Sequence, residues 1–406
     1  MAALAHTQGP PRPAWLHNRV LAVLLMGAMA AALGLAFLSV APNRLVSGTG
    51  LRLGELLGAA HPTHPTHAAH AVKAVLGLPL LGLLLAVFLP SSRAVHAGVA
   101  VAAALLLAVT VWLAGAEAAR DSGASSTLAR VSLGGGFWAV TLLLWLMVAD
   151  ALQRLGLSPA RRTLAHLAVL APLAVLLGGG ALDSLSPLKE YANRDDVFRV
   201  AALGHLHIVA ATLLPALLIG VPLGVAAARS ERVAAPLFAV LNVIQTVPSI
   251  ALFALLIAPL GGLAAVLPGL GIRGIGLWPA VIALTLYALL PIVHGTASGL
   301  RQVPAAAVAA AVGMGMTARQ VFRRVEVPLA LPVLLSGLRV TTVQVIGLAV
   351  VAALIGAGGF GALVFQGLAS SALDLVMLGV LPVVALAIVA DAGLELLTAA
   401  FKGPQP

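Results

Sequence analysis

Cysteine is absent from this sequence of 406 residues, which excludes disulfide bonds, zinc–thiolate sites and cysteine-ligated iron–sulfur clusters. Charged residues are scarce as well: they make up 9% of the chain, whereas a soluble domain carries roughly a quarter. Hydrophobic residues make up 61%, and the mean hydropathy is +1.08. A water-facing surface cannot be built from this composition, so we conclude that lipid surrounds most of the chain.

Aromatic residues are also few, at 4%, and only two of them are tyrosines. The formal net charge of +10 would suit nucleic acid, but lysine and arginine are scattered between apolar runs instead of gathered in one domain. Little is left for stacking on bases. We therefore predict no nucleic-acid partner and interpret the basic residues as loops that orient the chain in a membrane.

Enzymatic motifs are missing too. The sequence contains neither H-E-x-x-H nor G-x-S-x-G. A Walker loop requires Gly-Lys-Ser/Thr, and the lysines, Lys73, Lys189 and Lys402, do not stand in that setting. Asp150 and Asp391 lie near the ends of predicted spans, so no central carboxylate indicates an ion relay. We predict that the chain is not an enzyme, binds no cofactor of its own and receives energy through a partner.

Two local motifs match binding sites without the context that such sites need. "HPTHPTHAAH" places a histidine at every third position from His61 to His70. Histidine repeats can bind metal, but the prolines keep these side chains off a common helical face, and we favour a solvated loop over a metal site. "GAGGFG" (356–361) matches G-x-G-x-x-G, but no strand precedes it, so we interpret it as a flexible turn.

Long apolar runs are what the sequence has in abundance. A bilayer core roughly 30 Å thick needs about 20 apolar residues of helix, and lipid satisfies no backbone polar groups. The runs are too continuous for the alternating strands of a barrel. We predict an all-α membrane bundle of about ten transmembrane helices, near residues 20–41, 72–90, 95–114, 132–152, 163–181, 205–228, 233–260, 276–298, 332–356 and 374–400.

The polar segments between these spans predict orientation and domain division. Most of the 23 lysines and arginines fall on one face when both termini are placed in the cytoplasm, in agreement with the positive-inside rule. "DSLSPLKEYANRDD" (183–196) is the longest polar passage after residue 131. We predict an N-terminal unit over 1–182, an external linker over 183–200 and a second five-helix unit over 201–406.

A short basic segment, "GMGMTARQVFRRVEVPLALP" (313–332), lies between two spans of the second unit and follows a run of strong helix formers. Pro304 suits a first helical turn, where its missing N–H costs nothing. "AAAVAAAV" (305–312) predicts a helix, and Gly313 and Gly315 release the chain from it.

Thr317 and Gln320 have the spacing of a capping box, which predicts a second short helix that ends at Pro328. We call residues 304–328 the elbow. Its second helix has an apolar stripe with basic residues beside it (Val321, Phe322 and Val325; Arg319, Arg323 and Arg324). Such a helix either lies among lipid headgroups or docks onto a partner protein.

The elbow resembles the EAA loop of binding-protein-dependent ABC permeases. That loop reads E-A-A, three residues, Gly, nine residues, I-x-L-P. The matching residues here are Ala309-Ala310-Ala311, then Gly315, then Val325-Glu326-Val327-Pro328. One position departs from the pattern, because the family's glutamate is Ala309 here; alanine keeps the helix but removes a charge.

Three further passages resemble the glycine betaine and choline branch of these permeases, at 242–256, 325–339 and 355–391. The resemblance covers roughly residues 200–400 and implies that the second unit is a type I importer permease core. It also implies that residues 301–330 form the cytoplasmic coupling loop. A multi-span extension such as residues 1–182 is found in one subgroup of osmoprotectant permeases.

The resemblance further implies a multi-pass subunit of a bacterial inner membrane. Two permease subunits, as a homodimer or with a second permease, would join ABC ATPase subunits that hold ATP and Mg, and an extracytoplasmic binding protein would deliver the solute. Glycine betaine, choline or a related osmoprotectant is the implied solute. The alternatives are methionine, another amino acid or another small solute, and a membrane anchor or sensor that transports nothing.

The resemblance assigns contact with the ATPase to the coupling loop, at Ala309, Ala310, Ala311, Gly313, Gly315, Thr317, Arg319, Phe322, Arg323, Arg324, Val325, Glu326 and Pro328. We hypothesise that Phe322 and Val325 supply the buried contact. The three arginines would pair with ATPase acids at its rim, where charges set orientation more than affinity.

Polar groups within apolar spans are candidates for the translocation pathway, at Gln245, Thr246, Pro248, Ser249 and Gln344. The alternative is that these groups only bond neighbouring helices. Glycines that suit close helix packing are Gly220, Gly224, Gly337 and Gly347.

Overall fold

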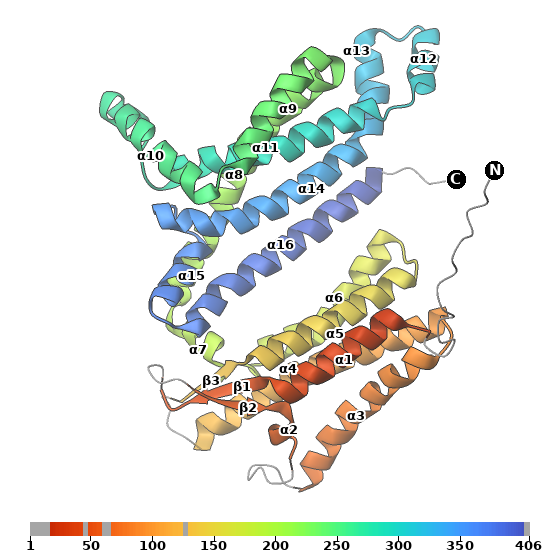
Figure 1. The fold of residues 1–406 in the computed structure, drawn as a ribbon, viewed down its shortest axis with the longest axis vertical. Helices are drawn as coiled ribbons and strands as arrows, with labels where there is room; N and C mark the ends of the chain where they lie inside the picture. Colours follow the sequence, from red (N-terminus) through yellow and green to blue (C-terminus); the bar gives the residue numbers. More distant parts are fainter. Residues whose placement is uncertain (1–16, 44–47, 59–65, 125–128, 402–406) are drawn as a thin grey trace, which may run out of the picture. The chain divides into compact units, whose positions relative to one another are not determined.

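The computed structural model describes residues 17–43, 48–58, 66–124 and 129–401 (Figure 1). The histidine repeat lies outside the described side chains, so its predicted role stays untested. The chain divides into two compact units, Met1–Lys189 and Glu190–Pro406. The predicted linker at 183–200 is mostly helical, because α7 covers Ser186–Asn193 and α8 begins at Asp195.

The first unit is a helical bundle with leucine, valine and alanine in its core. Its helices are α1 (Arg19–Gly34), α3 (Thr66–Phe88), α4 (Arg93–Ala124), α5 (Gly135–Arg154) and α6 (Pro159–Gly178). α4 packs against α3, α5 and α6, and α1 packs against α3 and α5. Leu83, Ala103 and Val148 are fully buried where these helices meet.

A small sheet caps this bundle and corrects one predicted span. The helix expected over 20–41 ends at Gly34, and the chain continues as β1 (Ala36–Ala41). β1 pairs antiparallel with β2 (Thr49–Arg52) and β3 (Arg130–Leu133), and the short helix α2 (Leu53–Leu56) follows β2. Strand pairing satisfies the backbone of β1, while its Phe37 and Leu38 are fully buried in the core cluster around the sheet.

The second unit is built around α11. Its elements are α8 (Asp195–Arg229), α9 (Glu231–Thr246), α10 (Ser249–Val266), a 3-10 turn (Pro268–Leu270), α11 (Leu277–Arg301), α12 (Ala305–Gly313), α13 (Ala318–Val321), a π-helix (Phe322–Glu326), α14 (Val327–Val351), a 3-10 turn (Ala352–Ile355), α15 (Phe360–Ala369) and α16 (Leu373–Phe401). α11 packs against both α8 and α14, and α14 packs against α16. α12 and α13 lie at the opposite end of α14 from α15 (Figure 1).

The predicted span over 233–260 is broken in two. α9 ends at Thr246 and α10 begins at Ser249, with Val247 extended at φ −70° and ψ 128°. Pro248 explains the break, since proline has no N–H for the helix and excludes the helical conformation from the residue before it.

In the described part of the chain, eight helices are long and apolar enough to cross a membrane, and shorter apolar helices accompany them at Arg19–Gly34, Ala74–Phe88 and Phe360–Ala369. The prediction of an all-α, polytopic membrane bundle is confirmed apart from the small sheet of the first unit. Arg339 lies near the middle of α14 and faces α16 through an ion pair with Asp391.

Three of the four glycines expected at close helix contacts lie there. A Cβ at Gly224 would be 2.5 Å from Cβ of Thr296, and one at Gly220 would be 2.8 Å from Cγ2 of Ile292, so side chains of α11 pack directly on the backbone of α8. A Cβ at Gly337 would be 3.2 Å from Cα of Gly295. Gly347 was predicted wrongly, because nothing lies within 4 Å of its Cβ position.

Candidate coupling elbow and translocation cavity

The elbow begins with the predicted helix. α12 (Ala305–Gly313) has Pro304 as its N-cap. Beyond it, Gly315 adopts a φ of +80°, and the amide of Met316 donates to the carbonyl of Ala311 over 3.1 Å. This left-handed turn favours glycine, and it redirects the chain into the second half of the elbow.

The predicted capping box is confirmed. The amide of Thr317 donates to Oε1 of Gln320 at 2.8 Å, and the amide of Gln320 donates to Oγ1 of Thr317 at 3.4 Å. Two amides that a helix start leaves unpaired are thereby satisfied. The sequence alone therefore fixes where α13 starts.

The second helix does not end at Pro328, contrary to the prediction. A π-helix (Phe322–Glu326) follows α13, and α14 begins at Val327 with Pro328 in its first turn. The amide of Val327 donates to the carbonyl of Phe322, five residues back. Because the π-turn resets the helical register, the proline ring is accommodated without a kink that ends the helix. The second half of the elbow is thus continuous with the transmembrane helix α14.

The elbow exposes a different apolar pair from the one predicted. Arg319, Arg323 and Arg324 are exposed, as are Ala309 and Ala310, whereas Ala311 is buried. Phe322 and Val325 are half-buried against the chain itself. The most exposed large apolar side chains of the elbow are Val312 and Met314, at 58% and 71%. They flank the glycine turn, a position that the sequence showed but that the search for a helical stripe overlooked.

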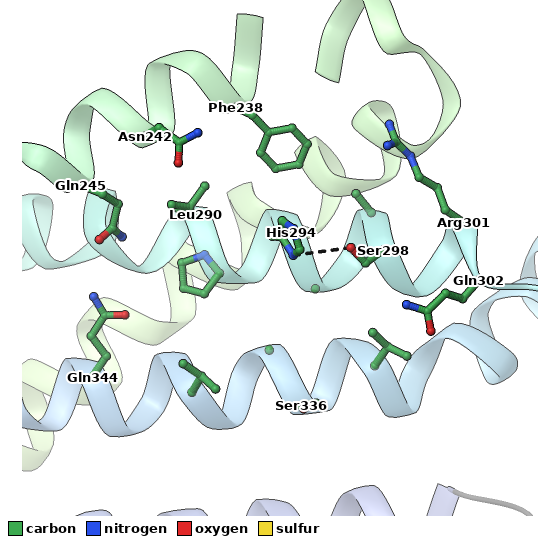
Figure 2. A pocket seen from close by; sticks show the side chains of 16 residues that line it. Phe238, Asn242, Gln245, Leu290, His294, Ser298, Arg301, Gln302, Ser336 and Gln344 are labelled. Atoms are coloured by element: carbon green, nitrogen blue, oxygen red, sulfur yellow. Dashed lines mark hydrogen bonds between the residues drawn. The ribbon is translucent and has the colours of Figure 1, made fainter. Parts of the chain in front are cut away.

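A cavity of about 930 Å³ lies between α9, α11 and α14 (Figure 2). Along α11 its lining extends from Leu290 to Gln302, about 18 Å of helix. Figure 2 shows Gln245 and Gln344 near one end of the cavity, and Arg301 and Gln302 near the other. The second end is the end of α11 from which the elbow departs.

Two of the five predicted pathway residues, Gln245 and Gln344, line the cavity. Nε2 of Gln245 also donates to the carbonyl of Tyr287 at 2.6 Å, so this side chain ties α9 to α11 as well. Thr246, Pro248 and Ser249 are not among the lining residues, and the hydroxyl of Thr246 donates within its own helix to Val243 at 2.7 Å. Pro248 turns the chain away from the cavity.

The lining contains polar groups that the sequence reading did not single out. Asn242 precedes Gln245 by three residues and therefore shares its helical face, a spacing that could have revealed it. The side-chain amides of Asn242, Gln302 and Gln344 have no hydrogen-bond partner among the described residues. His294 lies 3.5 Å from the hydroxyl of Ser298, the contact drawn in Figure 2.

Charge and aromatic rings are both sparse in this lining. Within the described region, Arg301 is its only permanently charged residue, and that guanidinium is 3.0 Å from Glu231. Phe238 is the only phenyl ring there, and it packs edge-on to His294 with ring centroids 5.9 Å apart. An aromatic cage that holds a quaternary ammonium needs several rings, so the described lining does not form such a cage.

Comparison with known proteins decides between the interpretations left open by the sequence. The N-terminal domain of the ABC transporter permease YehY matches residues 18–188. The inner membrane component of binding-protein-dependent transport systems matches residues 220–403. The osmoprotectant import permease protein OsmW of Salmonella typhimurium is 43% identical over 187 residues, which are 46% of this chain and 83% of OsmW.

This chain belongs to the inner-membrane permease family of binding-protein-dependent ABC transporters. The glycine betaine/carnitine/choline transport system permease protein OpuCB of Bacillus subtilis is 35% identical to the permease over 187 residues, 46% of this chain and 80% of OpuCB. A solved structure of the MetNI methionine ABC transporter in inward-facing conformations matches 52% of the permease and 99% of its own chain, at 21% identity and a TM-score of 0.47. The resemblance of the second unit to the permease family is confirmed, and the permease is a transport subunit.

Proposed function

We propose that the permease is the membrane pathway of an importer for glycine betaine, choline or a related osmoprotectant. The names of OsmW and OpuCB identify such solutes as what those proteins carry. The observation that carries the proposal is the placement of the cavity, which is lined by α11 and α14, the two helices that lead into and out of the elbow. A displaced elbow therefore acts directly on the walls of the cavity.

The lining suits a solute that binds only weakly while it crosses the membrane. Unpaired amides at Asn242, Gln302 and Gln344 offer donors and acceptors to water or to a zwitterion, and the described lining contains no carboxylate that would hold a cation. Solute selection then belongs to an extracytoplasmic binding protein, which delivers the solute to the permease.

The remaining parts of the proposal concern the assembly. ATP and Mg bind to separate ATPase subunits, and a second permease subunit, identical or not, completes the pathway. Both termini lie in the cytoplasm together with the coupling loop (301–330). Residues 201–406 act as the permease core, and residues 1–182 form an extension joined to it through 183–200.

The function is tested by uptake of radiolabelled glycine betaine and choline into vesicles that contain the permease, its ATPase and its binding protein. We expect accumulation that requires ATP and all three proteins. Accumulation driven by the permease alone would overturn the proposal. So would labelling of a Met314→Cys variant from the outside of intact cells, a clean assay because the chain has no other cysteine.

The elbow is expected to dock through Val312 and Met314, with the arginines at the rim. Both side chains are more than half exposed, and apolar residues at the centre of a contact carry more of its energy than charges at its edge. Met314→Asp should weaken binding of the ATPase by at least about tenfold, because it buries an uncompensated charge. Binding is measured by passing the purified ATPase over the permease, which is solubilised in detergent and immobilised.

Met314→Leu is the matched control and should bind as the wild type does, since it keeps an apolar side chain of similar volume. Phe322→Ala should have a smaller effect than Met314→Asp, because Phe322 is half-buried against the permease itself. Equal binding by the Met314→Asp and Met314→Leu variants would show that the docking contact lies elsewhere.

A further inference from the structure

An ion pair joins the last residue of α8 to the elbow. Nη1 of Arg229 donates to Oε1 of Glu326 at 3.0 Å, and Nη2 donates to Oε2. The two residues are 97 positions apart in sequence. The Glu326 side chain is only 12% exposed, whereas that of Arg229 is 52% exposed. A carboxylate buried to this extent depends on its partner, so the pair fixes the elbow to α8.

The same arginine contacts both ends of the π-helix. Its guanidinium carbon lies 5.7 Å from the ring centroid of Phe322, the first residue of that segment, while Glu326 is the last. Single π-turns inside longer helices are frequent at functional sites. Arg229 therefore holds the π-helix that joins α13 to α14.

The corner between α8 and α9 (residues 227–231) is held from a second side as well. Arg301, the last residue of α11, donates to the carbonyl of Ala227 at 2.8 Å and to Glu231 at 3.0 Å. Ala227 is fully buried and packs with Ala234 of α9 and Ala297 of α11.

One corner thus grips the elbow at its entry and at its exit. The elbow is entered from Arg301 and left through Glu326, and both residues bond to the corner. The same corner begins α9, which carries Phe238, Asn242 and Gln245 into the cavity. Because the corner bonds directly to both ends of the elbow, α9 can move with the elbow as a rigid helix, and neither α11 nor α14 has to bend.

We propose that the corner 227–231 is the joint through which the elbow moves α9, with Arg229 and Glu326 as positioning residues that couple ATP hydrolysis to opening of the cavity. This proposal rests on the proposed function of the elbow. It adds a third moving wall, α9, to the two helices that the elbow continues directly.

The pair is removed without leaving a buried charge by the double variant Arg229→Gln/Glu326→Gln. In vesicles that contain the complete importer, we expect the amount of glycine betaine accumulated per ATP hydrolysed to fall at least fivefold, while binding of the ATPase stays within twofold of the wild type. The reversed pair, Arg229→Glu/Glu326→Arg, should recover most of the ratio, which a loss of folding alone would not do.

The matched control removes another ion pair of α8, by Arg199→Gln/Asp195→Asn. That pair is exposed at the other end of the helix and joins residues four positions apart, so the ratio should not change. An unchanged ratio in Arg229→Gln/Glu326→Gln would overturn the joint, as would failure of the reversed pair to improve on it.

A second measurement does not depend on transport. Spin labels at Val240→Cys on α9 and Ala310→Cys on the elbow, both exposed positions, report the distance between the two elements in the purified permease. We expect one narrow distance distribution with the pair intact and a broad one in Arg229→Gln/Glu326→Gln. A distribution that stays narrow in this variant contradicts the joint. If the complete importer carries no solute, the proposed function is contradicted, and the distance measurement still tests the joint by itself.

Discussion

Alanine at Gly361 is expected to destabilise the permease by about 1–3 kcal/mol, although alanine forms helices better than glycine does. Gly361 is buried in the first turn of α15. Its added methyl group would overlap the carbonyl oxygen of Val350 and would lie 2.8 Å from Cβ of Ala353. Both obstacles belong to the end of α14 and the 3-10 turn after it, so the backbone has to move.

The same substitution at Gly347 serves as the control. Gly347 lies in α14 with nothing within 4 Å of its Cβ position, so Gly347→Ala should leave stability unchanged or raise it by up to about 1 kcal/mol. The thermal unfolding midpoints of the two purified variants and the wild type give the comparison. Equal midpoints for Gly361→Ala and Gly347→Ala would mean that α15 does not pack on α14 as closely as the structure has it.

The close packing of α15 also explains the conformation of the glycine-rich turn at its start (356–361), which the sequence predicted only in part. The "GAGGFG" segment was predicted as a flexible turn between two spans. Gly356, Gly358 and Gly359 all have positive φ, between +71° and +82°. A Cβ at Gly359 would lie 3.1 Å from Nδ1 of His205, and the ring of His205 packs 5.3 Å from that of Phe360. The glycines therefore permit a close approach to α8, which no local pattern indicates.

Local chemistry explains which parts of the elbow could be predicted. The capping box at Thr317 and Gln320 involves residues three apart, and the sequence revealed it completely. The continuation through Pro328 could not be predicted in the same way, because it depends on a π-helix stabilised by Arg229, which lies 97 residues before Glu326. Proline taken alone indicates a helix end, and here tertiary contacts prevail over that tendency.

Long-range pairing also hid the small sheet. The apolar run that starts at Val20 continues into β1 without a polar break, so hydropathy cannot mark the change from helix to strand at Gly34. β1 finds its second partner at Arg130–Leu133, about 90 residues later.

In the cavity, isolated amides within apolar helices were informative for Gln245 and Gln344. The neighbours of Gln245 at Pro248 and Ser249 were not, since the break in the helix directs them elsewhere.

Removal of the Arg339 side chain is expected to have the other large effect. Nη2 of Arg339 lies 2.5 Å from Oδ2 of Asp391 and 3.3 Å from Glu395, so one guanidinium on α14 serves two carboxylates on α16. Arg339→Leu leaves both acids on a transmembrane helix without this partner. A charge at the centre of a span costs about 2.5–3.5 kcal/mol on the insertion scale, and the cost here is smaller because both acids lie in the C-terminal half of α16, where the Asp391 side chain is 37% exposed. α16 is mostly exposed to the surroundings of the bundle. We expect much less folded permease in the membrane and a lower unfolding midpoint.

Compensating variants separate the charge from the volume of the side chain. Arg339→Leu/Asp391→Leu/Glu395→Gln removes all three charges and should recover most of the lost protein, because replacing a whole partly buried ion cluster by neutral residues is far milder than removing one member. Arg339→Lys should fall between the wild type and Arg339→Leu, since an ammonium keeps the charge but cannot bond both oxygens of Asp391 in parallel. If Arg339→Leu accumulates and unfolds as the wild type does, the cluster contributes nothing to the packing of α16. The carboxylates of Asp391 and Glu395 would then have to reach water at the membrane surface instead of facing α14.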